Sequence, residues 1–127
     1  MGAHKVLIQA LAVNTRTVQA MPYNPGMEKQ YKTFAEFYPF YLSEHQDRTC
    51  RRLHFFGTTI GLMLFATALI QGQPWFILLG VVVGYAFAWV GHFVFEKNRP
   101  ATFQYPLFSF MGDWVMWKDM LTGKIEF

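Results

Sequence analysis

Apolar positions dominate the middle of the chain in two long runs. They cover residues 53–70 and 75–95, and the short polar stretch 71–74 (Gln-Gly-Gln-Pro) separates them. Each run is close to the ~20 residues that an α-helix needs to cross the ~30 Å hydrocarbon core of a bilayer. No Asp, Glu, Lys or Arg occurs between Arg52 and Glu96, whereas a surface helix in water normally carries a charged face. The pattern predicts two transmembrane helices joined by a tight turn. A buried hairpin in a soluble helical bundle is the alternative.

Amphipathic segments flank this hairpin on both sides. Residues 31–44 place aromatic and apolar side chains on one helical face, at Phe34, Phe37, Tyr38, Tyr41 and Leu42. Pro39 is expected to kink this helix, because it removes one backbone hydrogen bond. Residues 105–121 form a second amphipathic pattern that ends before Gly123. We therefore expect an all-α integral membrane protein, a two-helix transmembrane hairpin flanked by amphipathic interfacial helices.

The first part of the chain lacks a periodic pattern. It contains a short apolar run, Val6 to Val13, and further along a cluster of helix breakers between Pro22 and Gly26. We expect residues 1–26 to be a flexible or dispensable extension, and residues 27–127 to form a single helical membrane domain.

Composition narrows the function classes. Charged residues make up only 15% of the 127 residues and hydrophobic residues 53%, which excludes a disordered chain and a charge-rich coiled coil. The single cysteine excludes an intramolecular disulfide framework and a cysteine-rich zinc site. The net charge of +3 is small and dispersed, so no nucleic-acid partner is expected. Membrane lipids are expected partners, and a homo-oligomer stays open.

The distribution of cations predicts the orientation. The turn between the two runs has no Lys or Arg, whereas both flanks carry several: Lys29, Lys32, Arg48, Arg51 and Arg52 before the first run, and Lys97, Arg99, Lys118 and Lys124 after the second. The positive-inside rule then places both termini in the cytoplasm. The expected location is a membrane crossed more than once, which is the inner membrane in a bacterium.

Three histidines are candidates for a metal site. In an antiparallel hairpin that folds about residues 72–73, His54 lies level with residue 91 and hence beside His92. Glu96 follows on the same helical face, one turn closer to water. His45 precedes the first span at the same surface, but it needs a bend at residues 46–48 to face His54.

Neutral imidazole is the commonest ligand for several transition metals. Histidines with a carboxylate suit non-haem Fe(II) and oxygen chemistry, and the same set can hold zinc, so His45, His54, His92 and Glu96 form a candidate metal site. Arg99 is a candidate for binding a substrate carboxylate, and Tyr41 for orienting a ligand. Cys50 is interpreted as structural. A haem protein with His54 and His92 as axial ligands and a non-enzymatic membrane adaptor are the alternatives.

Three stretches carry a resemblance to a known family. They are residues 37–41 (Phe-Tyr-Pro-Phe-Tyr), residues 51–57 (Arg-Arg-Leu-His-Phe-Phe-Gly) and residues 91–101 (Gly-His-Phe-Val-Phe-Glu-Lys-Asn-Arg-Pro-Ala). Together with His45 they resemble domain-of-unknown-function family 962, small membrane proteins related to the fungal 2-hydroxy fatty acid dioxygenase of phytosphingosine degradation. The resemblance covers residues 31–121.

The resemblance implies an Fe(II)-dependent dioxygenase that acts on 2-hydroxy fatty acids and O2. Such an enzyme carries out α-oxidation, releasing an aldehyde shortened by one carbon and CO2. His45, His54 and His92 match the histidines of the family, and Glu96 and Arg99 match its third motif. The resemblance therefore implies that the three histidines bind Fe²⁺ and that Glu96 is a catalytic group.

Overall fold

The computed structural model describes residues 30–127, and every regular element in this range is a helix. The all-α fold class is confirmed for these residues. The extension predicted at residues 1–26 lies outside them. The chain divides after Ser43 into two compact units, which are described separately. The prediction of one helical domain over residues 27–127 stays a prediction.

The first unit contributes helix α2, Phe34–Ser43. Its start is a capping box: the Thr33 hydroxyl accepts the Glu36 N–H, while the Glu36 carboxylate accepts the N–H groups of Lys32 and Thr33. These backbone hydrogen bonds lower the pKa of the Glu36 carboxyl. Pro39 lies inside the helix. The expected aromatic face is present, and within it Phe37 and Tyr41 are buried.

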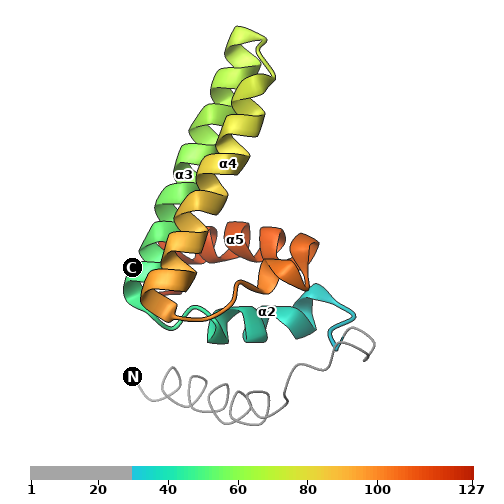
Figure 1. Ribbon diagram of the computed structural model, residues 1–127, viewed down its shortest axis with the longest axis vertical. Coiled ribbons are helices and arrows are strands. Elements are labelled where there is room, and N and C mark those ends of the chain that lie inside the picture. Colours follow the sequence, from blue (N-terminus) through green and yellow to red (C-terminus); the bar gives the residue numbers. More distant parts are fainter. Residues whose placement is uncertain (1–29) are drawn as a thin grey trace. The chain divides into compact units, whose positions relative to one another are not determined.

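The second unit is built on a helical hairpin (Figure 1). Helix α3, Arg48–Gln71, runs antiparallel to α4, Trp75–Val90, which continues as the π-helix η1, Gly91–Glu96. Asp47 caps α3 by accepting the Cys50 N–H at 3.0 Å. Gly72 ends α3 in the left-handed conformation (φ 62°), which permits the tight turn. Both apolar runs of the sequence lie within these helices.

Glycines bring the two helices of the hairpin into backbone contact. A Cβ atom on Gly80 would lie 3.2 Å from the Gly61 carbonyl oxygen, and one on Gly57 would lie 2.8 Å from the Phe87 Cβ. Small residues at such spacing let helix backbones approach closely. The register that results corrects the sequence-based one. Gly57 faces Gly84, so His54 lies level with about residue 87 instead of residue 91.

Helix α5, Pro106–Leu121, lies across the base of the hairpin (Figure 1). It follows the short 3-10 helix η2, Ala101–Phe103. The Trp117 indole N–H donates to the Thr59 hydroxyl of α3 at 3.0 Å, and its ring stacks on Phe55. This contact fixes one face of α5 against α3, with Asp113 one turn away on the same face.

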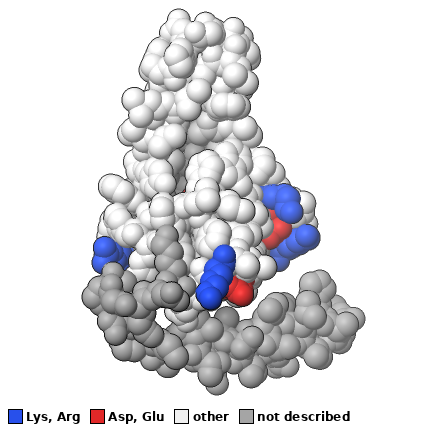
Figure 2. Space-filling view, turned by 90° about the vertical axis from the view of Figure 1, so that its right-hand side faces the viewer, with Lys and Arg blue, Asp and Glu red and all other residues white. Residues whose placement is uncertain are grey.

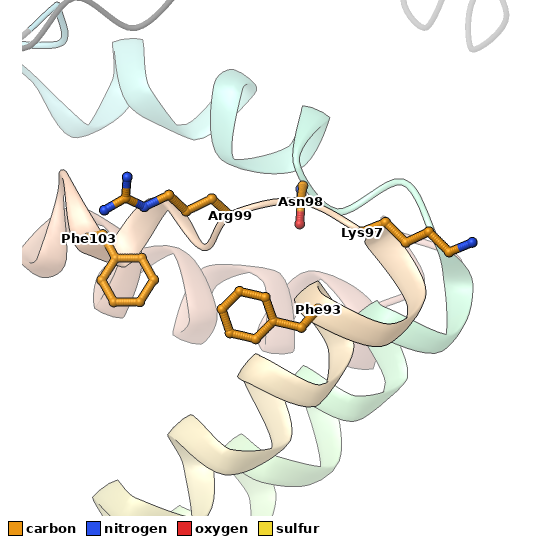
Figure 3. Close-up of a pocket in the computed structure, with 5 residues that line it drawn as sticks. All are labelled: Phe93, Lys97, Asn98, Arg99 and Phe103. Carbon is orange, nitrogen blue, oxygen red and sulfur yellow. The ribbon is translucent and has the colours of Figure 1, made fainter.

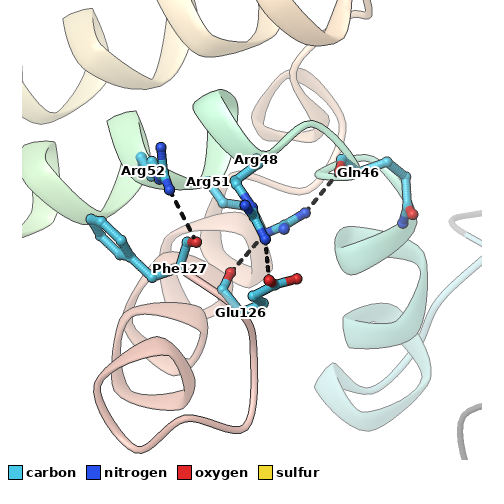
Figure 4. Close-up of polar contacts among 6 residues, drawn as sticks. All are labelled: Gln46, Arg48, Arg51, Arg52, Glu126 and Phe127. Atoms are coloured by element: carbon cyan, nitrogen blue, oxygen red, sulfur yellow. Dashed lines mark hydrogen bonds and ion pairs between the residues drawn. The ribbon is translucent and has the colours of Figure 1, made fainter.

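The C-terminal residues bind the first turn of α3 (Figure 4). Arg48 forms an ion pair with Glu126, and Arg51 and Arg52 donate to the backbone oxygens of Glu126 and Phe127. Arg52 also lies over the Phe127 ring, 5.0 Å from its centroid. Three of the cations that the sequence marked as topology signals, Arg48, Arg51 and Arg52, therefore have partners within the protein.

The hairpin exposes most of its apolar surface. Arg48–Gln71 and Trp75–Glu96 are each long and apolar enough to span a membrane, and only 17% of each apolar window is buried. The face of the upper hairpin seen in Figure 2 carries no charged side chain, and the charges in this view gather toward its base.

A methyl group added at the helix contact tests the packing. Gly57→Ala should destabilise the hairpin by about 1–3 kcal/mol, because the new Cβ would overlap Phe87 Cβ, an atom that cannot swing away. Gly84→Ala is the matched control, since its Cβ would meet nothing closer than 3.8 Å. Thermal unfolding followed by circular dichroism in mild detergent measures the difference. Equal stability of the two variants would contradict the glycine contact.

Candidate metal centre

Three histidine rings meet at the base of the hairpin. His45 precedes α3, His54 lies on its second turn and His92 lies in η1. The ring centroids are 4.5–5.0 Å apart, and the Nε2 atoms of His45 and His54 are separated by 3.3 Å. All three side chains are between 2% and 5% exposed. The structure thus brings together the histidines that the sequence singled out.

The bend expected between the first two histidines is present. Residues 45–47 are not helical, and this break turns His45 back toward His54. The Arg51 guanidinium holds the bend, because it donates to the carbonyl oxygens of His45 at 3.1 Å and Gln46 at 2.8 Å (Figure 4). Arg51 therefore links the segment that carries His45 to the helix that carries His54.

A chain of hydrogen bonds sets the tautomer of His92. The Asn98 amide nitrogen donates to the backbone and carboxylate oxygens of Glu44, both at 3.0 Å. The Asn98 Oδ1 atom then faces His92 Nδ1 at 2.8 Å and accepts its proton. His92 Nε2 is left with its lone pair. Burial raises the pKa of the Glu44 carboxyl, as does the negative charge of Glu96, while the hydrogen bond from Asn98 opposes this shift.

The π-helix is what brings Asn98 back to His92. Lys97 ends η1 in the left-handed conformation (φ 57°), and its N–H and that of Asn98 both donate to the His92 carbonyl oxygen. The chain reverses there, so the Asn98 side chain returns over the His92 ring. Single π turns inside α-helices occur frequently at functional sites.

An acidic partner from α5 orients His54. The Asp113 carboxylate lies 3.0 Å from His54 Nδ1. An ionised carboxylate only accepts, so Nδ1 carries the proton and Nε2 presents its lone pair. This carboxylate–histidine arrangement is the one that usually fixes metal-binding imidazoles. Sequence reasoning missed Asp113 and Asn98. The only signal for Asp113 was a carboxylate among apolar residues of an amphipathic helix.

Cys50 belongs to the same cluster. It lies one turn before His54 on α3, is fully buried, and its Sγ is one of four potential metal-ligand atoms that lie within 4.8 Å of one another, together with those of the three histidines. From the sequence alone, Cys50 was interpreted as structural. The spacing of four residues from His54 was a signal that both side chains share a helical face.

The remaining candidates from the sequence are Glu96, Arg99 and Tyr41. Glu96 accepts the backbone N–H of Asp47 and so joins the end of η1 to the start of α3; it is not one of the four clustered residues. Arg99 lies over the Phe103 ring, 5.1 Å from its centroid, in an open groove lined by Phe93, Lys97, Asn98, Arg99 and Phe103 (Figure 3). Tyr41 is a residue of the first unit, and its ligand-binding role stays a prediction.

The chemistry of the donor set and the spacing of one ligand pair fit a transition metal ion. Two nitrogen ligands at tetrahedral angles and bond lengths of about 2.0–2.1 Å lie about 3.3 Å apart, which is the separation of the His45 and His54 Nε2 atoms. His54 binds Asp113 through Nδ1, and His92 binds Asn98 through Nδ1. The unprotonated Nε2 atom of each ring therefore points away from these partners. A porphyrin does not fit between His54 and His92, since their ring centroids are 5.0 Å apart and His45 packs on both.

Fold and site define a class of small helical-hairpin proteins with a buried histidine cluster suited to a metal ion. A family model described as 2-hydroxy-palmitic acid dioxygenase Mpo1-like matches residues 31–125, and the chain belongs to this Mpo1-like family. The match confirms the resemblance seen in the sequence. Comparison with curated proteins gave no match, and comparison with solved structures gave none.

The Asp113 contact leads to a prediction about metal affinity. Asp113→Asn keeps an oxygen that can accept from His54 Nδ1 but removes the negative charge, so we expect metal binding to weaken roughly 10- to 100-fold. Asp119→Asn, six residues along the same helix, should leave the affinity unchanged. Competition titrations with a chromophoric chelator give both affinities. A similar loss in both variants would show that the effect is not specific to the histidine contact.

Proposed function

We propose that the protein is a membrane-embedded, Fe(II)-dependent dioxygenase of 2-hydroxy fatty acids. The observation that carries the proposal is the convergence of His45, His54 and His92, two of them oriented through Nδ1, in a chain of the Mpo1-like family. The three histidines would hold the ion. Bound Fe(II) would supply the activation of O2 and the oxidation of carbon two of the substrate.

The protein residues would bind and orient the substrate. Arg99 would pair with the carboxylate, since a guanidinium is suited to two parallel hydrogen bonds with a carboxylate. The rings of Phe93 and Phe103 line the same groove (Figure 3) and would contact the first methylene groups of the acyl chain. Tyr41 would help to orient the ligand, and the Glu96 carboxylate would act as a base.

The atom balance permits two sets of products. A 2-hydroxy acid and one O2 give an aldehyde shortened by one carbon, CO2 and hydrogen peroxide. The same reactants also give a carboxylic acid shortened by one carbon, CO2 and water. In this second reaction both atoms of O2 end up in these products. The sequence resemblance led us to expect the aldehyde. Product analysis should therefore measure aldehyde, acid and peroxide together.

An activity assay tests the proposal. The full chain in mild detergent, loaded anaerobically with Fe(II), should consume O2 with 2-hydroxypalmitate and release CO2 and a product with fifteen carbons. Palmitate, which lacks the hydroxyl group, should not react.

Arg99→Gln should raise KM roughly 10- to 100-fold, the loss expected for a hydrogen bond to a charged group. Lys124→Gln, at an exposed position outside the groove, is the control. No turnover by the iron-loaded wild type on 2-hydroxy acids of any chain length would contradict the proposal and favour the adaptor.

The hairpin is the proposed membrane anchor, with both termini and the histidine cluster on the cytoplasmic side. Core helices of soluble proteins are mostly buried, whereas 17% of each apolar window is buried here. The surface over the upper hairpin also lacks charge (Figure 2), and in lipid a helix satisfies its own backbone groups.

A charge placed on the exposed face of α4 tests the membrane location. Val82 is 57% exposed in the middle of the hairpin. Val82→Lys should cost about 2.5–3.5 kcal/mol in a bilayer, whereas an exposed position in water tolerates the change within about 0.5 kcal/mol. We expect the variant to be lost from the alkali-resistant membrane fraction, while Gln71→Lys at the exposed end of α3 stays there. A Val82→Lys protein that is soluble, folded and iron-binding without detergent would favour the soluble bundle.

A further inference from the structure

Cys50 is placed where a fourth metal ligand would be. Its Sγ lies within the same 4.8 Å cluster as the ligand atoms of the three histidines, and the residue is fully buried. The thiol occupies this position because residue 91 is a glycine. A Cβ on Gly91 would lie 3.0 Å from the Cys50 Sγ and 3.3 Å from its Cα. The missing side chain at residue 91 thus lets η1 approach α3 closely and leaves room for the Cys50 thiol.

Charge balance gives an independent reason for a thiolate. Three neutral imidazoles leave both positive charges of a divalent ion uncompensated, and a buried uncompensated charge is costly. Asp113 supplies one negative charge through His54. Glu96 supplies none directly, because its carboxylate is bound to the Asp47 N–H and lies outside the cluster. A Cys50 thiolate would supply the second charge inside the cluster.

We propose that Cys50 is a metal ligand and that the centre is a three-histidine, one-cysteine site. The proposal rests on the proposed metal centre and deepens it. On binding, the Cys50 thiol loses its proton to water and the thiolate binds the ion. A soft sulfur ligand favours iron, zinc or copper over magnesium, calcium or manganese, in contrast to a site completed by Glu96.

Cobalt(II) is the probe that reports sulfur ligation directly. Co(II) gives visible absorption bands from any low-symmetry protein site and an additional, intense near-ultraviolet band when a thiolate is bound. Cys50 is the only cysteine in the chain, so in a thiol-free buffer that near-ultraviolet band can come from no other residue. Metal-free full-length protein in mild detergent is titrated with Co(II), and both sets of bands are followed.

We expect both sets of bands in the wild type, saturating together at one equivalent. Cys50→Ser should abolish the near-ultraviolet band while visible bands of histidine-bound Co(II) remain, and Gly91→Ala should weaken it by displacing the thiol. Circular dichroism shows whether each variant is folded. The wild-type spectrum is decisive even if a variant fails to fold.

Two outcomes of the titration would overturn the proposal for different reasons. Visible bands without the near-ultraviolet band in the wild type would show that the metal centre exists and that Cys50 is not a ligand. No Co(II) bands at all in the folded wild type would refute the proposed metal centre itself, and the assignment of Cys50 with it.

Discussion

The backbone contact between α3 and α4 is the constraint on which the site depends. At Gly57, Gly61 and Gly80 the helices touch without intervening side chains, so their register is fixed by sterics. A slip of one residue would move one helix by about 1.5 Å, whereas a binding constellation must be held to within about 0.5 Å. The depth at which His54 and His92 face one another is therefore set by apolar packing that begins less than one turn from His54, at Gly57, and extends along the hairpin away from both imidazoles.

Orientation of the imidazoles comes from a different source, the polar residues at the base of the hairpin. Asp113 on α5 and Asn98 after η1 each hold one Nδ1 atom, and Glu44 fixes the direction of the Asn98 amide. A buried imidazole without such a partner would choose its tautomer freely. Because the partners come from three different segments, the ring orientations depend on the completed fold. The hairpin alone supplies the distance between His54 and His92, and the flanking segments supply the direction in which their nitrogens point.

The sequence alone was sufficient to predict the helical hairpin and the proximity of the histidines. The gap in charge between Arg52 and Glu96 defines both helices, and antiparallel geometry then places His54 and His92 near one level. The register was wrong by about one turn, because the close contacts of Gly57 with Gly84 and of Gly61 with Gly80 set it, and counting residues from the turn does not predict these contacts. Asn98 was missed because its position depends on the π turn and on the left-handed Lys97, neither of which has a periodic signal. Asp113 was missed because the packing of α5 on α3 is a long-range contact that a helical pattern does not specify.

Consecutive residues after η1 connect the groove to the histidine cluster. The left-handed Lys97 turns Asn98 toward His92, and Arg99 then extends along the groove beside Phe103 (Figure 3). Asn98 is shared, since it lines the groove and also accepts from His92 Nδ1. A carboxylate held by Arg99 would thus be bound one residue away from the group that fixes the His92 tautomer. If the groove binds the ligand as proposed, any movement of this segment would be transmitted to the imidazole through one hydrogen bond, and ligand recognition would be coupled to the orientation of His92.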